Sequence, residues 1–147
     1  MKHLGWPSEF DRNSQREWFE GVFDVDERGG GYVIGEQATA LLIDLQCIYC
    51  AGAFVSVVVM SCTIVDCHLR EAELPRNFKG GIKAVFESSA FAQELDWLRK
   101  YRNQLVHFGP TQAVTVDDQW GLRERHQDDA MCSVLLVADV LFENPFT

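Results

Sequence analysis

The chain has 147 residues, of which 47% are hydrophobic and 24% are charged, close to the average for soluble domains. This length fits one compact domain, and the composition excludes a largely disordered chain, a collagen-like repeat and a low-complexity polymer. The formal net charge of -9 disfavours broad, non-specific adhesion to nucleic acid, because like charges repel at long range.

The cysteine content favours a reducing compartment. Five cysteines cannot all pair with one another, and the first residues contain no apolar run typical of a secretory signal. We therefore expect a cytoplasmic protein with free thiols. Cys47 and Cys50 form a C-x2-C pair, but no second pair with ligand spacing follows. We expect neither a metal nor another cofactor.

The sequence divides into an N-terminal segment, 1–35, and a main helical domain, 36–147. A short amphipathic helix is predicted over 8–23. The break after it is rich in acidic residues and contains three consecutive glycines from Gly29, which disfavour a helix there.

Residues 36–69 contain no proline and a single glycine, Gly52. The stretch predicts one central apolar helix, roughly 50 Å long at about 1.5 Å per residue. Its uncharged part, 45–65, is also long enough to span a membrane. Asp44 and Asp66 bracket that part, and basic flanks are missing. A buried helix of a bundle or dimer is therefore favoured over a membrane span.

The remaining sequence predicts shorter helices joined by polar connections. A loop over 111–121, with a short extended piece at 113–116, precedes the last helix. Further helices are expected at 82–88, at 89–107 and from Leu122 or Asp128 to Phe142. The expected fold is an all-α bundle of about four to five helices.

The predicted helix over 89–107 carries the most informative residues. One of its stripes is apolar and contains Phe91, Leu95, Leu98 and Val106. Arg102 falls in the middle of that stripe, where an unpaired guanidinium is costly unless it lies in a wet cleft. Asn103 and His107 are four residues apart and therefore share the adjacent face.

This stretch resembles the active-site motif of the HEPN superfamily, in which an arginine, often followed by a polar residue, precedes a histidine by four to six residues. Here Arg102 and Asn103 are followed by His107. The order of a long helix with a late acid (Asp66), a connection, a motif helix and a final helix is also similar. The resemblance covers about residues 36–143 and implies a helical bundle.

Many members of that superfamily are dimeric, metal-independent ribonucleases, so the resemblance implies an RNA substrate and a cleft shared by two chains. Arg102 would hold the scissile phosphate, His107 would transfer protons, and Asn103 would orient either group. Asp66 would support Arg102. The expected contacts to RNA are made by Arg99, Lys100 and Tyr101.

The resemblance also suggests a toxin or antiviral defence protein with a cognate antitoxin or other partner protein. In toxins of this family that are silenced by nucleotide transfer, a tyrosine lies two residues after the histidine, where this chain has Gly109. That regulation is therefore not expected in the same form. Residues 68–102 hold seven of the 13 basic residues and only five acidic ones. This region is therefore mildly basic, which weakens the electrostatic objection to RNA binding.

Less specific interpretations of the same residues remain open. Arg102 would then pair with Asp66 or Glu94, and His107 would cap the last carbonyls of its helix. The chain would be a non-catalytic HEPN-like interaction module or, less favoured, a single-span membrane protein. His3 and His126 are expected at the surface.

Overall fold

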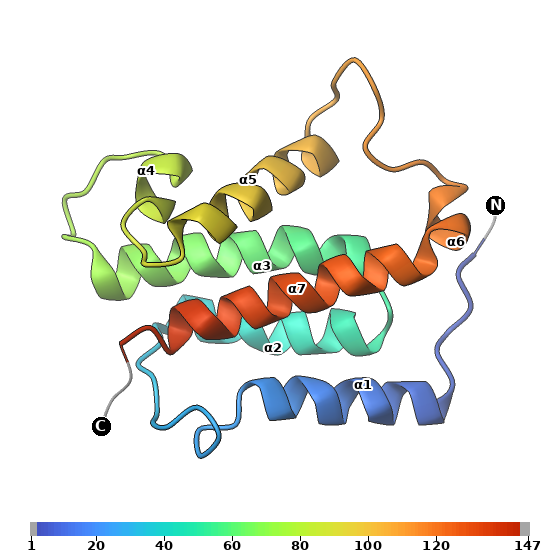
Figure 1. Ribbon diagram of the computed structural model, residues 1–147, viewed down its shortest axis with the longest axis horizontal. Helices are drawn as coiled ribbons and strands as arrows, with labels where there is room; N and C mark the ends of the chain where they lie inside the picture. Colours follow the sequence, from blue (N-terminus) through green and yellow to red (C-terminus); the bar gives the residue numbers. More distant parts are fainter. Residues whose placement is uncertain (1–2, 145–147) are drawn as a thin grey trace.

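The computed structural model describes residues 3–144. In this range the chain forms helices and no strand, which confirms the predicted all-α class (Figure 1). The elements are α1 (Glu9–Val22), α2 (Glu36–Cys50), α3 (Phe54–His68), the π-helical turn η1 (Leu69–Glu73), α4 (Ile82–Phe86), α5 (Ala92–Val106), α6 (Asp118–Gly121) and α7 (Arg123–Leu141).

Helix α3 is the centre of the bundle and packs against α2, α5 and α7 (Figure 1). Helix α1 covers α2 on the outer side and also contacts α7. The core consists of the apolar side chains that face α3 from these neighbours. Its largest fully buried members are Tyr49, Phe86, Leu45, Ile64, Leu69, Leu95 and Leu98.

The prediction of one long helix over 36–69 is wrong, because the chain reverses direction between α2 and α3 (Figure 1). Gly52 has a φ of 74°, a left-handed conformation that only glycine adopts without strain. The amide of Ala53 donates to the carbonyl of Ile48 at 2.9 Å, and that of Gly52 donates to Tyr49 at 2.9 Å. These two bonds form a Schellman motif, the usual way of ending a helix at glycine.

Arg123, the first residue of α7, fixes this turn from outside. Its Nη2 donates to the carbonyl oxygen of Gly52, and its guanidinium carbon lies 4.3 Å from the centre of the Phe54 ring. A cation thus satisfies a carbonyl left free at the end of α2 and stacks on the ring that opens α3. The α2–α3 hairpin is therefore tied to α7 as well as packed against it.

The uncharged run 45–65 is split by this turn into the inner faces of two helices. Its residues Leu45, Val57, Val58 and Ile64 are each at most 1% exposed. No helix within residues 3–144 is both long enough and apolar enough to cross a membrane.

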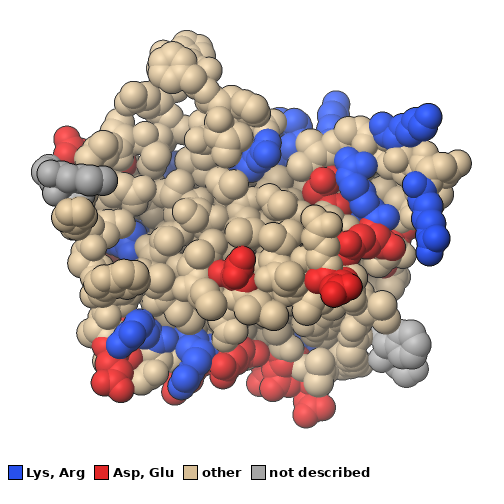
Figure 2. Space-filling model, turned by 180° about the vertical axis from the view of Figure 1, so that it is seen from behind, with Lys and Arg blue, Asp and Glu red and all other residues tan. Residues whose placement is uncertain are grey.

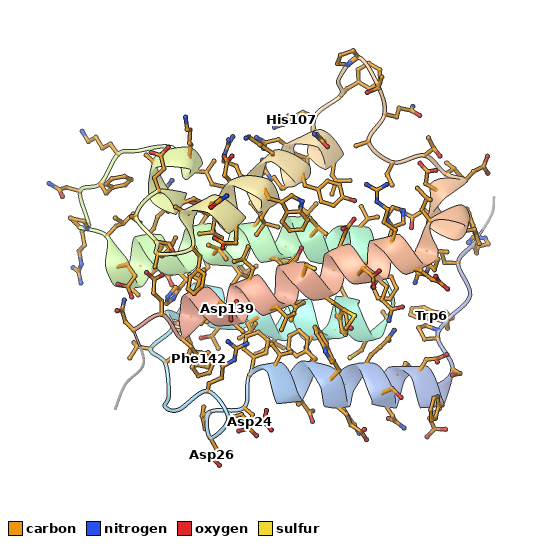
Figure 3. The ribbon with its side chains drawn as sticks, viewed as in Figure 1. Trp6, Asp24, Asp26, His107, Asp139 and Phe142 are labelled. Carbon is orange, nitrogen blue, oxygen red and sulfur yellow. The ribbon has the colours of Figure 1, made fainter. Side chains whose placement is uncertain are left out.

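Helix α1 and the glycine-rich break join the same bundle. Phe19 is only 4% exposed and belongs to the shared core. The break turns back to the end of α7, where Arg28 binds Asp139 at 2.5 Å and lies over the ring of Phe142. Asp24 and Asp26 mark this turn in Figure 3, below Asp139 and Phe142.

Helix α7 begins at Arg123, so Asp128 lies inside the helix instead of at its N-terminus. This start puts His126 on the inner face of α7, one turn before the fully buried Ala130. His126 is 4% exposed, and the expectation of a surface position is wrong for it. His3 is exposed as expected.

Candidate functional site

Helix α5 carries the predicted site, and its first turn is held by the end of α7. Glu143 accepts hydrogen bonds from the Ser89 hydroxyl and from the Ala90 amide, both at 2.7 Å. The Ser89 hydroxyl in turn accepts the amide of Phe91 at 3.1 Å. These bonds occupy amides that would otherwise be free at the start of the helix. They fix the direction in which α5 leaves the core.

The C-terminal half of α5 rises away from α3 (Figure 1). Leu95 and Leu98 are fully buried against the core, whereas Arg102 is half-buried and Val106 is 42% exposed. The predicted apolar stripe is therefore buried in the first half of α5 and exposed to solvent at the end of the helix. Arg102 lies where the two helices separate, so its charge keeps access to water.

Arg102 has a neutral hydrogen-bond partner in place of an acidic one. Its Nη1 donates to Oδ1 of Asn103 at 3.0 Å. Arg28, Arg70 and Arg99 each bind a carboxylate, but within residues 3–144 no carboxylate lies within ion-pair distance of Arg102. A half-buried guanidinium without a carboxylate partner is suited to bind an anionic ligand.

Cys62 of α3 lies near this arginine. Burial raises the pKa of the Cys62 thiol to about 11, and the positive charge of Arg102 opposes that rise. The thiol is therefore neutral near pH 7. Its role at this position is to fill space between α3 and α5.

Asp66 does not contact Arg102. Its Oδ1 accepts from Nε of Arg70 at 2.9 Å, and Nη2 of Arg70 reaches the carbonyl of Gly80 at 3.0 Å. Asp66 thereby holds the connection between η1 and α4. Glu94 likewise forms no ion pair with Arg102. Neither of the two structural partners predicted for Arg102 binds it within the described residues.

His107 ends α5 in an extended conformation, and its backbone amide donates to the carbonyl of Asn103 at 3.0 Å. The ring is exposed at the outer end of the helix (Figure 3), and no hydrogen bond to it is formed within residues 3–144. Asn103 thus connects the two predicted catalytic groups: its side chain binds Arg102 and its carbonyl binds the backbone of His107.

The three residues predicted to contact RNA are already engaged with other side chains. Arg99 and Lys100 both bind Asp96 at 2.6 Å, and these hydrogen bonds lower the pKa of that carboxyl. Tyr101 faces α7; burial and the charge of Asp129 raise its pKa to about 12. Arg99 and Arg102 both lie near Cys62, whereas Tyr101 lies on the side of α5 that faces Asp129 of α7.

A hollow of about 280 Å³ lies beside His107 and is formed by the last turn of α5 and the loop 107–114. Its walls include the amide side chains of Gln104 and Gln112 and the apolar Val114, and no Asp, Glu, Lys or Arg lines it. Phe108 stands at its edge and is 94% exposed. The sequence analysis missed this hollow, because a loop's path cannot be inferred from periodicity. The one available signal was an aromatic residue directly after the motif histidine.

Figure 2 shows the back of the molecule, turned by 180° from Figure 1, on which charged side chains are unevenly distributed. Basic side chains gather at the end of the molecule that carries α4, while the middle is nearly free of charge. We use the name α2/α3 face for the exposed or half-buried uncharged residues of these two helices, which include Ile43, Cys47, Ser56, Val59, Met60 and Thr63.

Residues 3–144 hold no group of three histidine, cysteine or acidic side chains close enough to bind one metal ion. All five cysteines are unpaired. Comparison with known proteins found no matching family model, no similar curated protein and no similar solved structure. Function therefore has to be inferred from the geometry at the end of α5.

Proposed function

We propose that the chain is a metal-independent endoribonuclease of the HEPN type, acting in the cytoplasm as part of a toxin or defence system. The observation that carries the proposal is the environment of the Arg102 side chain, namely its burial and its hydrogen-bond partner. This half-buried guanidinium has no carboxylate partner within residues 3–144, is oriented by Asn103 at 3.0 Å, and lies five residues from the exposed His107. A positive charge and an imidazole at one helix end are what RNA cleavage requires of a protein.

The chemistry uses the nucleophile already present in RNA. The 2′-hydroxyl attacks the adjacent phosphorus atom, the bond to the 5′-oxygen of the next nucleotide breaks, and a 2′,3′-cyclic phosphate forms. Imidazole accepts the proton of the 2′-hydroxyl or donates one to the leaving 5′-oxygen, and the imidazole of a second chain supplies the other step. Arg102 binds the phosphate oxygens and offsets the charge that develops on them.

The first test is cleavage of single-stranded RNA by purified protein in the presence of EDTA. We expect products that end in a 2′,3′-cyclic phosphate, and a rate at least about a hundredfold lower for His107→Ala, as is usual when a proton-transfer group is lost. His3→Ala is the matched control, because His3 is also exposed and lies outside the site. Equal rates for the His107→Ala variant and the wild type would rule out this role of the imidazole.

The proposed ribonuclease is a homodimer, and the α2/α3 face suits its interface, because a self-complementary interface works best with little charge. Ile43 is 61% exposed on that face although it is strongly apolar. We expect light scattering at micromolar concentration to give twice the chain mass of 16.7 kDa. Ile43→Asp should give the monomer mass while thermal unfolding stays cooperative. A monomeric wild type would remove the shared cleft.

A non-catalytic HEPN-like module that binds a partner protein is the second candidate. It is favoured by the His107 ring, which no neighbouring side chain within residues 3–144 orients, unlike a typical catalytic imidazole. This candidate predicts a stable dimer that cleaves no RNA under any condition. A cognate antitoxin or other partner would then be the functional ligand.

A further inference from the structure

We propose that the hollow beside His107 binds an unpaired nucleobase of single-stranded RNA, with Phe108 as its stacking platform. The inference rests on the proposed ribonuclease function and names the substrate class of the same site. It starts from the 94% exposure of Phe108, which is the highest among the large hydrophobic side chains of residues 3–144.

The composition of the hollow favours a base over other ligands. A nucleobase is flat, uncharged and apolar on its faces, and its edge carries hydrogen-bond donors and acceptors. The hollow matches this: Phe108 offers a ring face, Gln104 and Gln112 offer amides that both donate and accept, and Val114 adds apolar surface. No Asp, Glu, Lys or Arg lines the hollow, so an uncharged ligand fits it better than a metal ion or a free phosphate does.

The position of the hollow places the base next to the reacting phosphate. His107 belongs to both the hollow and the proposed catalytic pair, and Phe108 is its direct neighbour in the chain. A base stacked on Phe108 would fix the nucleotide whose phosphate is close to His107. Bases in a duplex are covered by their neighbours on both faces, so this mode of binding selects single strands.

Among the other exposed aromatic side chains, Trp97 lines two hollows, but charged side chains share the walls of both. Phe10 is 78% exposed, but it lies on the outer helix α1 and lines none of the larger hollows. Removing it changes the exposed aromatic surface without touching α5, so it provides a matched control for Phe108. Since Phe108 is almost fully exposed, its replacement is not expected to impair folding.

The test measures binding of a short single-stranded RNA that contains 2-aminopurine and carries 2′-O-methyl groups, which prevent cleavage. Stacking on an aromatic ring quenches 2-aminopurine fluorescence. We expect quenching by the wild type and by Phe10→Ala, and quenching retained by Phe108→Trp. For Phe108→Ala we expect no quenching and roughly tenfold weaker binding, the usual cost of one lost stacking contact. The annealed duplex should bind more weakly than the single strand.

Equal affinity and equal quenching for Phe108→Ala and Phe10→Ala would overturn the inference. A Phe108→Ala variant that binds RNA as the wild type does, but changes from dimer to monomer in light scattering, would assign Phe108 to a protein interface instead. The outcomes also separate this inference from the proposed function. Binding with quenching but no cleavage of unmodified RNA contradicts the ribonuclease alone, and cleavage without any effect of Phe108→Ala contradicts the base site alone.

Discussion

Arg102→Ala is expected to lower the rate of RNA cleavage by at least about a hundredfold, the usual cost of removing one group that stabilises developing charge in a transition state. Arg102→Lys should restore only a minor part of the rate, because an ammonium cannot bind two phosphate oxygens in the geometry of a guanidinium. Single-turnover cleavage with excess protein measures both variants without interference from product release.

The fold should tolerate these changes, since Arg102 forms no ion pair within residues 3–144 and its bond to Asn103 is neutral. Arg125→Ala is the control for the loss of one positive charge, because Arg125 is an exposed residue on α7. If Arg125→Ala slows cleavage as much as Arg102→Ala does, the effect is one of net charge. If neither variant differs from the wild type, Arg102 has no role at the phosphate.

Gly52→Ala is expected to be the most destabilising small substitution in the chain, lowering the free energy of unfolding by about 2–5 kcal/mol. The φ of 74° is strained for alanine, and a Cβ at this position would lie 2.6 Å from Nη2 of Arg123. The guanidinium would have to leave the Gly52 carbonyl and lose its stacking on Phe54. Denaturant unfolding measures the change directly.

Gly21→Ala is the matched control for this substitution. Gly21 lies in α1, and no atom is found within 4 Å of a Cβ added there. Alanine should therefore raise stability by up to about 1 kcal/mol, because it favours the helix. A Gly52→Ala variant as stable as the wild type would show that the turn and its arginine contribute little to the fold.

The sequence predicted the helices accurately where capping residues and apolar periodicity agreed. The helix at 8–23 and the motif helix at 89–107 are both present, shifted by at most a few residues. The turn after Cys50 was missed because Gly52, a common residue at the end of a helix, is a single glycine within a long apolar run. The contact that ties this turn to α7 comes from Arg123, which lies 71 residues away, and no local pattern reveals it.

The candidate site was predictable only in part, for the same reason. Arg102, Asn103 and His107 are local to one helix, and their relation follows from helical spacing. Asp66 and Arg70 are four residues apart, so their pairing also follows from helical spacing, and it leaves Arg102 without this carboxylate. The hollow next to Phe108 depends on the course of a loop and was out of reach.

The hydrogen bonds between Glu143 and the start of α5 also affect the order in which the chain can fold during synthesis. Ala90 and Glu143 are separated by 53 residues, so this contact cannot fix the direction of the motif helix until all of α7 and Glu143 have been synthesised. A nascent chain that has reached only the motif holds Arg102 and His107 on a helix without its anchor. For the ribonuclease proposed above, this order of assembly delays activity until the chain has been synthesised through α7 to Glu143.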